Sequence, residues 1–337
     1  MTAHTIRTAA IHSILLAACC LLWTCNSIIY DYEGDCTVHY LVRFSYDYNM
    51  KYADAFAHEV DAVTLYLIDS GGNIVWQKTE RGTKVAHTGY TMEVDATPGR
   101  YTLMAWCEKE SDAPAYHFTT KPFCAALPGG HTDSPAESRT ELRNLFYGMT
   151  QDVELPAMDE GTFVLEMPLV KDNNHITINL QQLGGEPLQP EEVQMEITDH
   201  NAVLGWDNMP TSQSAAIYRP WHMSSITTLP DPATRTEDTY SGVSAEFTTL
   251  RLMASHAADS RLRVTSTGTR QTILNLRLIE ALLLVKGYYN RQMDDQEYLD
   301  RQDAYSLTFF LDERKQWIDS QIIINGWRIV LQNTDLE

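Results

Sequence analysis

The chain has 337 residues, with 45 Asp and Glu against 25 Lys and Arg, and a formal net charge of −20. This length suggests about two domains of roughly 150 residues each, and 44% hydrophobic residues exclude a disordered acidic tail. The acidic excess argues against nucleic acid as a partner, because a phosphate backbone is bound by clustered Lys and Arg side chains.

Residues 1–24 have the pattern of a secretory signal peptide. They contain no Asp or Glu, and an apolar stretch runs from Ile14 to Trp23. This stretch is too short for a membrane-spanning helix. We therefore expect the chain to be exported into a compartment where cysteines can form disulfides.

Cysteines beside the apolar stretch suggest a lipoprotein signal, in which an acylated Cys becomes the mature N-terminus. Residues 16–19 (LAAC) fit this pattern better in residue type than residues 22–25 (LWTC). Cleavage before Cys19 would, however, leave a very short apolar region. We therefore predict lipidation at Cys25, with Cys19 as the alternative and simple secretion or a buried core helix as further ones. Residues 25–35 would form a solvated acidic tether.

Lipidation at Cys25 would leave Cys36, Cys107 and Cys124 in the folded part of the chain. Three cysteines form at most one disulfide, and the sequence does not say which two would pair. Buried free thiols are an equally good interpretation. The chain has no CxxC motif and no Cys/His spacing that would suggest zinc.

The first half of the mature chain alternates apolar and polar residues in short runs, the pattern of half-buried antiparallel strands. The sequence Asp69-Ser70-Gly71-Gly72 separates two such runs and predicts a hairpin turn, because glycine accepts positive φ. The expected strands are Val38–Tyr46, Ala62–Ile68, Asn73–Trp76, Tyr101–Trp106, Leu145–Tyr147 and Thr162–Met167.

A second series of strands begins after the polar residues 171–174, so we place the domain boundary near Asp172. The N-terminal domain then covers residues 36–171 and the C-terminal domain residues 172–337. Two β-rich halves indicate an all-β protein with two tandem β-sandwiches. The expected strands of the second half are His175–Leu180, Val193–Ile197, Phe247–Met253, Leu262–Thr265, Thr272–Leu276, Ser306–Leu311, Trp317–Ile324 and Trp327–Leu331.

Short helical insertions and polar loops interrupt the strands. A helical stretch is expected from Tyr52 to Glu59, and apolar residues at helical spacing predict another from Arg277 to Lys286. A short exposed helical turn is expected from Asp294 to Arg301. Runs of Pro, Gly, Asp and Ser predict exposed loops at 128–138 and 230–241.

Motifs of catalysis and cofactor binding are absent: the chain has no GxSxG, GxGxxG, GxxxxGK[ST] or HExxH. One acidic cluster lacks the glycine and the final glutamate of a calcium loop, so we interpret it as a solvated helix face. We therefore predict that the protein is not an enzyme and has no metal or cofactor. The cluster comprises Asp294, Asp295, Glu297, Asp300 and Asp303.

Four aromatic residues of the second half could stack on sugars, as in a carbohydrate-binding platform. Packing inside a sandwich is the commoner role of such residues. The four are Trp206, Trp221, Tyr288 and Tyr289.

An ordered set of fragments along nearly the whole mature chain resembles the FimB-type fimbrial anchor lipoproteins of Bacteroidales, which hold a polymeric fimbria on the outer membrane. The resemblance begins at Cys25-Asn26-Ser27-Ile28-Ile29-Tyr30-Asp31, which looks like the lipidated start of that family. The other fragments are 42–50 (VRFSYDYNM), 52–56 (YADAF), 98–101 (PGRY), 196–199 (EITD), 218–221 (YRPW), 251–253 (RLM), 296–301 (QEYLDR) and 327–331 (WRIVL).

The resemblance implies two transthyretin-like Greek-key β-sandwiches and assembly by strand donation. In such fimbriae a stalk subunit loses its first strand to an arginine-specific protease, and its empty groove accepts a strand from its neighbour. An anchor is expected to keep its first strand, so we predict no cleavage at Arg43.

The C-terminal strands are candidates for the contact with the major fimbrial stalk subunit. Gln321–Ile324 and Trp327–Leu331 form an apolar edge that a soluble monomer would normally protect. Trp327, Ile329 and Leu331 alternate with polar or smaller residues and could present one row of side chains to a groove. The alternative is that both strands pair within the C-terminal sandwich.

The predicted function is therefore that of a lipid-anchored, surface-exposed outer-membrane protein at the fimbrium base, which attaches the fimbria and limits its length. One alternative is an adhesive tip or accessory subunit of the same system. Another is a carbohydrate-binding surface lipoprotein.

Overall fold

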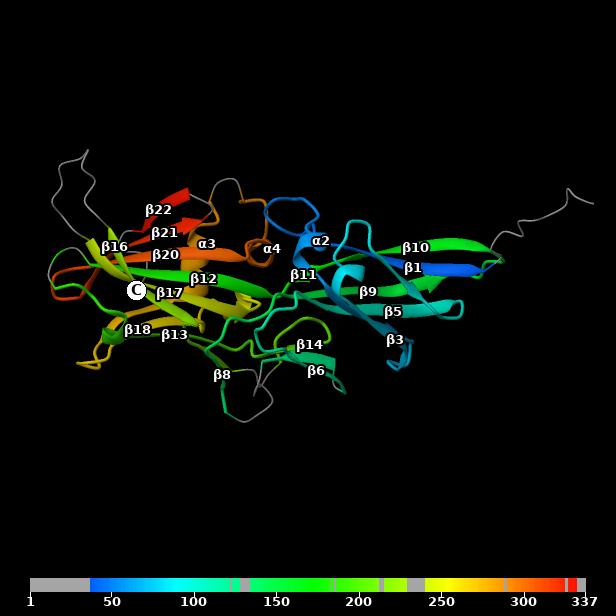
Figure 1. Cartoon of the computed structure of the whole chain (residues 1–337), viewed down its shortest axis with the longest axis horizontal. Helices are drawn as coiled ribbons and strands as arrows, with labels where there is room; N and C mark the ends of the chain where they lie inside the picture. The colour runs from blue at the N-terminus through cyan, green and yellow to red at the C-terminus, as the bar shows by residue number, and fades with distance from the viewer. Residues whose placement is uncertain are drawn as a thin grey trace, which may run out of the picture.

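The computed structural model describes residues 37–121, 123–127, 134–182, 184, 186–211, 215–228, 240–287, 290–324 and 327–331. Figure 1 shows two β-rich lobes that follow one another along the long axis of the molecule. The all-β fold with a few short helices is confirmed.

The N-terminal lobe is a sandwich of two sheets. A three-stranded sheet has the order β10-β1-β4, and a five-stranded sheet has the order β11-β9-β5-β2-β3. The strands are β1 (Val38–Ser45), β2 (Ala62–Ile68), β3 (Ile74–Arg81), β4 (Thr91–Val94), β5 (Gly99–Glu108), β9 (Leu145–Leu155), β10 (Gly161–Pro168) and β11 (Val170–Lys171).

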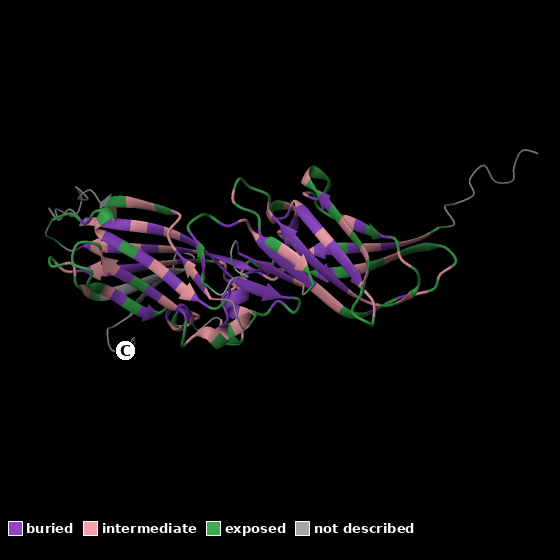
Figure 2. Cartoon of the chain, turned by 90° about the horizontal axis from the view of Figure 1, so that it is seen from below, coloured by how far each residue is buried: buried purple, intermediate pink, exposed green. Residues whose placement is uncertain are grey.

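Strand β1 supplies a row of aromatic and aliphatic side chains to the core of this lobe. Tyr40, Val42 and Phe44 are at most 4% exposed, whereas Arg43 between them faces solvent. Phe44 stacks on Phe56 and on Tyr90, with ring centroids 5.9 and 5.8 Å apart. The alternation follows from the period of two of a strand, and Figure 2 shows buried and exposed residues alternating along the strands.

The C-terminal lobe is a second sandwich with a larger sheet. Its six-stranded sheet has the order β16-β17-β12-β20-β21-β22, and a five-stranded sheet has the order β19-β18-β13-β15-β8. The strands are β8 (Ala136–Ser138), β12 (Asn173–Gln182), β13 (Val193–Asp199), β15 (Ala216–Tyr218), β16 (His222–Thr228), β17 (Tyr240–Leu250), β18 (Arg261–Ser266), β19 (Thr272–Arg277), β20 (Ala304–Leu311), β21 (Trp317–Ile324) and β22 (Trp327–Leu331).

A small third sheet covers the outer face of the five-stranded sheet of the N-terminal lobe. It has the order β14-β7-β6, with β6 (His117–Thr120), β7 (Phe123–Ala126) and β14 (Val203–Gly205). Its core side chains join Met104 and Trp106 of β5 and the core of the C-terminal lobe in one buried cluster. β5 is therefore apolar on both faces, because Leu103, Ala105 and Cys107 point into the other core.

One segment of the expected N-terminal domain pairs with the C-terminal lobe. The expected exposed loop at 128–138 is wrong for its last residues, because β8 pairs in parallel with β15 of the C-terminal lobe. Ala136 and Ser138 are buried by that pairing. β11 ends at Lys171 and β12 begins at Asn173, while the division into domains near Asp172 stays a prediction.

The helices are short: α2 (Phe56–Glu59), α3 (Leu278–Leu284) and α4 (Asp295–Arg301), with 3₁₀ turns η1 (Gly82–Lys84), η2 (Pro190–Glu192) and η3 (Ala254–His256). The expected helix from residue 52 is shortened, because Tyr52 has φ 51° and the Asp54 carboxylate accepts hydrogen bonds from the backbone of Tyr46 and Phe56. α4 begins where Asp294 Oδ1 caps the amide of Glu297 at 2.7 Å.

Candidate functional site

The first strand of the N-terminal lobe is paired on both sides. β1 pairs in parallel with β10 along its whole length and antiparallel with β4. Arg43 lies opposite Glu166, and its Nη1 is 3.0 Å from Glu166 Oε1. Proteolytic nicking needs an exposed segment that leaves its hydrogen-bonded structure. The folded lobe therefore protects the bond after Arg43.

The last described strand, in contrast, lies at the edge of a sheet. β22 pairs antiparallel with β21, from Ile324 opposite Trp327 to Ser320 opposite Leu331, and it is the terminal strand of the six-stranded sheet. The predicted donor residues Trp327, Ile329 and Leu331 therefore lie on this edge strand. Their side chains are outside the described part, so their role stays a prediction.

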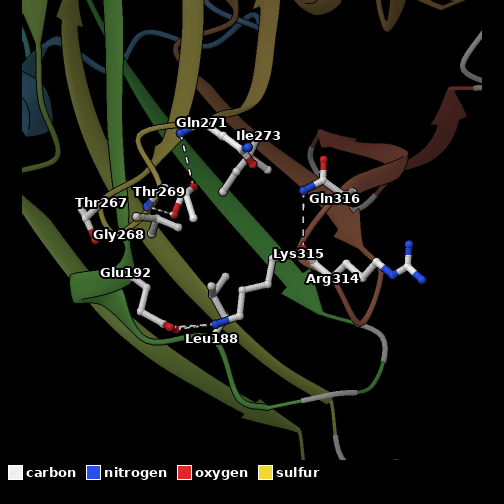
Figure 3. A pocket seen from close by; sticks show the side chains of 12 residues that line it. Leu188, Glu192, Thr267, Gly268, Thr269, Gln271, Ile273, Arg314, Lys315 and Gln316 are labelled. Atoms are coloured by element: carbon white, nitrogen blue, oxygen red, sulfur yellow. Dashed lines mark hydrogen bonds and ion pairs between the residues drawn. The ribbon is translucent and has the colours of Figure 1, made fainter.

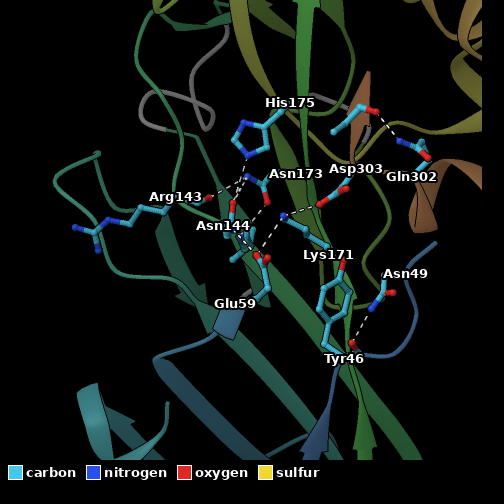
Figure 4. A network of polar contacts seen from close by, with 12 residues as sticks. Tyr46, Asn49, Glu59, Arg143, Asn144, Lys171, Asn173, His175, Gln302 and Asp303 are labelled. Atoms are coloured by element: carbon cyan, nitrogen blue, oxygen red, sulfur yellow. Dashed lines mark hydrogen bonds and ion pairs between the residues drawn. The ribbon is translucent and has the colours of Figure 1, made fainter. Parts of the chain in front are cut away.

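A buried lysine joins the two lobes at their junction (Figure 4). The side chain of Lys171 is 4% exposed, and its Nζ lies 2.7 Å from Asp303 Oδ2 and 3.5 Å from Glu59 Oε2. Glu59 ends α2 in the N-terminal lobe, whereas Asp303 precedes β20 in the C-terminal lobe. A buried charge must be paired, so Lys171 ties both elements to the connecting segment.

Amide side chains extend this junction. Asn144 Nδ2 donates to Glu59 Oε2 at 2.9 Å, and Asn173 accepts from the Leu145 amide at 3.1 Å. Burial, and then the charge of Lys171, lower the pKa of His175, which keeps its imidazole neutral beside the lysine. The network is polar, satisfied and shared by both lobes, as Figure 4 shows.

A second set of charges involves helix α4. Arg251 Nε and Nη2 donate to the two oxygens of Asp300 at 2.8 and 2.7 Å. The interpretation of the acidic cluster as a solvated helix face is wrong for Asp300, whose side chain is 5% exposed. The guanidinium of Arg301 lies over the rings of Tyr48 and Tyr52, 4.0 and 4.9 Å from their centroids. Tyr48 and Tyr52 lie in the loop between β1 and α2, and Arg301 is the last residue of α4. The two cation–π contacts therefore hold this loop against α4.

A pocket of about 330 Å³ lies where η2, the β18–β19 turn and the β20–β21 turn meet (Figure 3). Leu188 and Ile273 form apolar parts of its wall, and Gln271 and Arg314 add polar groups. Glu192 at its rim accepts two hydrogen bonds from Lys315 Nζ, at 2.7 and 2.8 Å, and these lower its pKa. The lining suits a small polar ligand, and no metal-binding group of His, Cys, Asp and Glu occurs among the described residues.

Of the four aromatic residues considered as a sugar platform, Trp206 and Trp221 lie among the described residues. Trp206 is 50% exposed on the loop after β14, where its backbone oxygen accepts from the Tyr147 hydroxyl. Trp221 instead contacts the ring of His222, with centroids 5.9 Å apart. Tyr288 and Tyr289 lie outside the described residues.

The remaining predicted site residues concern cysteines. Cys107 and Cys124 are both buried and are not bonded to each other. Burial raises the pKa of the Cys107 thiol, which makes it inert. The lipidation candidates Cys25 and Cys19, the signal peptide, the tether and Cys36 lie outside the described residues.

Sequence reasoning missed the junction residues Lys171, Glu59 and Asp303. The available signal was the polar run 171–174 between two apolar strands, which we interpreted only as a boundary. Nothing in the sequence shows that carboxylates 112 and 132 residues away converge on Lys171.

A comparison with protein families identifies the family of this chain. The model of the family described as "Mfa2: Fimbrillin-A associated anchor proteins Mfa1 and Mfa2" matches residues 32–333. The chain has no match among the curated proteins. No helix within the described ranges is long and apolar enough to cross a membrane.

Several solved structures share the fold over nearly their whole length. A candidate adhesin from Bacteroides thetaiotaomicron is 29% identical, with a TM-score of 0.74 over 89% of this chain and 100% of its own. A candidate polysaccharide-binding protein from the same organism is 27% identical, with a TM-score of 0.71 over 88% and 99%. The fimbrial anchor protein Mfa2 from Porphyromonas gingivalis, at 19% identity, has a TM-score of 0.60 over 88% and 99% and shows the same fold.

Proposed function

Because the chain belongs to the family of fimbrillin-A associated anchor proteins, we propose that it attaches a fimbria to the outer membrane and limits fimbrial length. Its family and fold are those of fimbrial structural and adhesin proteins, which are associated with the fimbrium and the cell surface. In this proposal acyl chains on Cys25, or alternatively Cys19, hold the mature N-terminus in the membrane.

The observation that carries the proposal is the filled sheet of the N-terminal lobe. A subunit that accepts a neighbour's strand must have a vacant position in a sheet. Here β1 occupies the middle of its sheet, paired with β10 and β4, and its side chains complete the core. Because the chain's own strand takes that position, no neighbouring subunit can add a strand there. The polymer of fimbrial subunits therefore ends at this protein.

Contact with the major stalk subunit is proposed to use the C-terminal edge. β22 has a neighbour on one side only in the described sheet, so it could leave β21 and enter the groove of a stalk subunit. Strand addition gains main-chain hydrogen bonds and fills pockets with alternate side chains. The row Trp327, Ile329 and Leu331 would supply those side chains.

Truncation tests this contact. Deletion of residues 326–337 removes β22 and should give a folded, membrane-bound protein that sheds its fimbriae into the medium. Deletion of residues 332–337 leaves β22 intact and is the matched control, with fimbriae retained. Circular dichroism melting separates the alternatives. A lost transition in the longer deletion means that β22 is needed for the fold of its own lobe, and an unchanged melt with retained fimbriae places the contact elsewhere.

Recognition of a carbohydrate is a second candidate function. The pocket beside Arg314 lies at the end of the molecule opposite the start of β1 (Figures 1 and 3), so it would face away from a membrane that holds the N-terminus. A relative at 27% identity is a candidate polysaccharide-binding protein. Calorimetric titration with oligosaccharides tests this function, and binding that survives Arg314→Ala would exclude the pocket.

A further inference from the structure

An aspartate and an asparagine meet in the interior between the two lobes. Asp172 lies between β11 and β12 and is 0% exposed, and Asn208 lies on the loop after β14 and is 3% exposed. Asn208 Nδ2 donates a hydrogen bond of 2.7 Å to Asp172 Oδ1. The pair thus connects the segment between the lobes to the loop that carries the exposed Trp206.

The second oxygen of each side chain lacks a hydrogen-bond partner. Asp172 Oδ2 and Asn208 Oδ1 are both buried and unpaired in the part of the chain that the structure describes. Buried polar atoms are normally paired, and an unmade bond is costly. Two oxygens that only accept hydrogen bonds cannot satisfy each other. A single hydrogen on the carboxyl group would satisfy both, because a protonated carboxyl is also a donor.

We propose that Asp172 is protonated in the folded protein and forms a two-bond ring with Asn208. Asp172 Oδ1 accepts from Asn208 Nδ2, and the Asp172 Oδ2 hydroxyl donates to Asn208 Oδ1. This ring is a latch between the lobe connection and residues 203–211. Loss of the proton removes the second bond and leaves an ionised carboxylate in the interior, which weakens the latch.

The charges around Asp172 agree with a neutral carboxyl group. The nearby titratable or charged groups are Arg251, Asp300, Tyr147 and Tyr116. The guanidinium of Arg251 is already neutralised by its two bonds to Asp300, and its Nη1 donates to the backbone oxygen of Asn208 at 2.7 Å. Burial raises the pKa of both tyrosines, so they remain uncharged at neutral pH.

The direction of the pH effect follows from burial. Burial raises the pKa of Asp172 from 3.8 to about 7, although Arg251 and the hydrogen bond from Asn208 act against it. The folded state therefore binds this proton more tightly than the unfolded state. The folded chain keeps this proton until the pH reaches about 7. The contribution of the proton to folding stability is complete below pH 3.8 and is lost progressively as the pH rises to about 7.

Carbon-13 NMR of the full chain labelled at the aspartate Cγ measures the protonation state directly. Asp172→Asn identifies the resonance of Asp172 by its disappearance. We expect that resonance at the position of a carboxylic acid at pH 5, with a midpoint near or above pH 7. A carboxylate resonance at pH 5 with a midpoint below pH 5 would overturn the proposal.

Two matched variants test the latch by a different readout. Asp172→Asn supplies an N–H where the proposal places the O–H, so the variant should fold. It has no proton to lose, so its melting temperature should lack the decrease between pH 5 and pH 8 that Asp172 causes. Asp300→Asn is the control, because it weakens a charged pair with Arg251 and should lower the melting temperature already at pH 5. Equal destabilisation by both variants at pH 5 would show that Asp172 is ionised and would refute the latch.

Discussion

The two ends of the described chain are built into their sheets in opposite ways. β1 is the central strand of its sheet and places Tyr40, Val42 and Phe44 in a closed core. β22 is the terminal strand of its sheet and pairs with β21 alone. Removing β1 would open a core, whereas β22 is proposed to exchange β21 for a stalk subunit. The difference is the basis of our proposal that the subunit gives a strand and does not take one.

The largest expected effect concerns the closed end. Phe44→Ala should lower the free energy of unfolding by about 3–5 kcal/mol, because it removes a buried ring that stacks on Phe56 and Tyr90. The adjacent Arg43→Ala is the control and should cost less than about 1 kcal/mol, since it breaks an exposed ion pair. Chemical denaturation measures both. Similar values for the two variants would mean that β1 is not part of the core.

The second effect concerns a buried ion pair of the C-terminal lobe. Arg251→Gln should cost about 3 kcal/mol, because it leaves the Asp300 carboxylate buried without its cation. Arg263→Gln in the same lobe removes an arginine that is 52% exposed beside Glu196, and should cost less than about 1 kcal/mol. If denaturation gives an equally small change for Arg251→Gln, the buried pair does not stabilise the fold.

The smallest effect is a pH dependence within the C-terminal lobe. The hydrogen bond that His256 Nδ1 donates to the Asp199 carboxylate, at 2.8 Å, raises the pKa of His256 above its usual 6.5. The raised pKa stabilises the fold fully below pH 6.5, and this contribution is lost as the pH rises through the higher folded pKa. His256→Gln should remove this part of the pH dependence. If the melting temperature of His256→Gln changes between pH 6 and 8 as much as that of the unmodified protein, the ion pair with Asp199 does not cause the pH dependence.

The sequence predicts several strands with their bounds because apolar and β-branched runs stand between turn residues. Ala62–Ile68, Trp317–Ile324 and Trp327–Leu331 are confirmed with their bounds. The two longest strands are only partly predicted: β9 extends well beyond the expected Leu145–Tyr147, and β17 starts before the expected Phe247. The short strands β4, β6, β7, β8 and β14–β16 were not predicted, because three to seven residues with little alternation give no signal of their own. β8 forms only because β15 offers a partner 80 residues later, Ala216 opposite Ala136.

The candidate site also has features that the sequence predicts and features that it does not. The edge strand and the intact first strand follow from local pattern and from the family resemblance. The junction does not, because the pairing of Lys171 with Asp303 and of Asp172 with Asn208 depends on how the lobes pack. A polar run such as 171–174 indicates a boundary from sequence alone, and only tertiary structure shows that its side chains are buried and paired.

Mass spectrometry of the mature N-terminus, on protein isolated from outer membranes, tests the central claim most directly. We predict a chain that begins at acylated Cys25 and still contains β1, because the proposed anchor keeps its own first strand and thereby ends the fimbria. A chain that begins at acylated Cys19 would change only the lipid position. A chain that begins at Phe44, after cleavage at Arg43, would contradict the account and indicate a subunit that accepts a neighbour's strand.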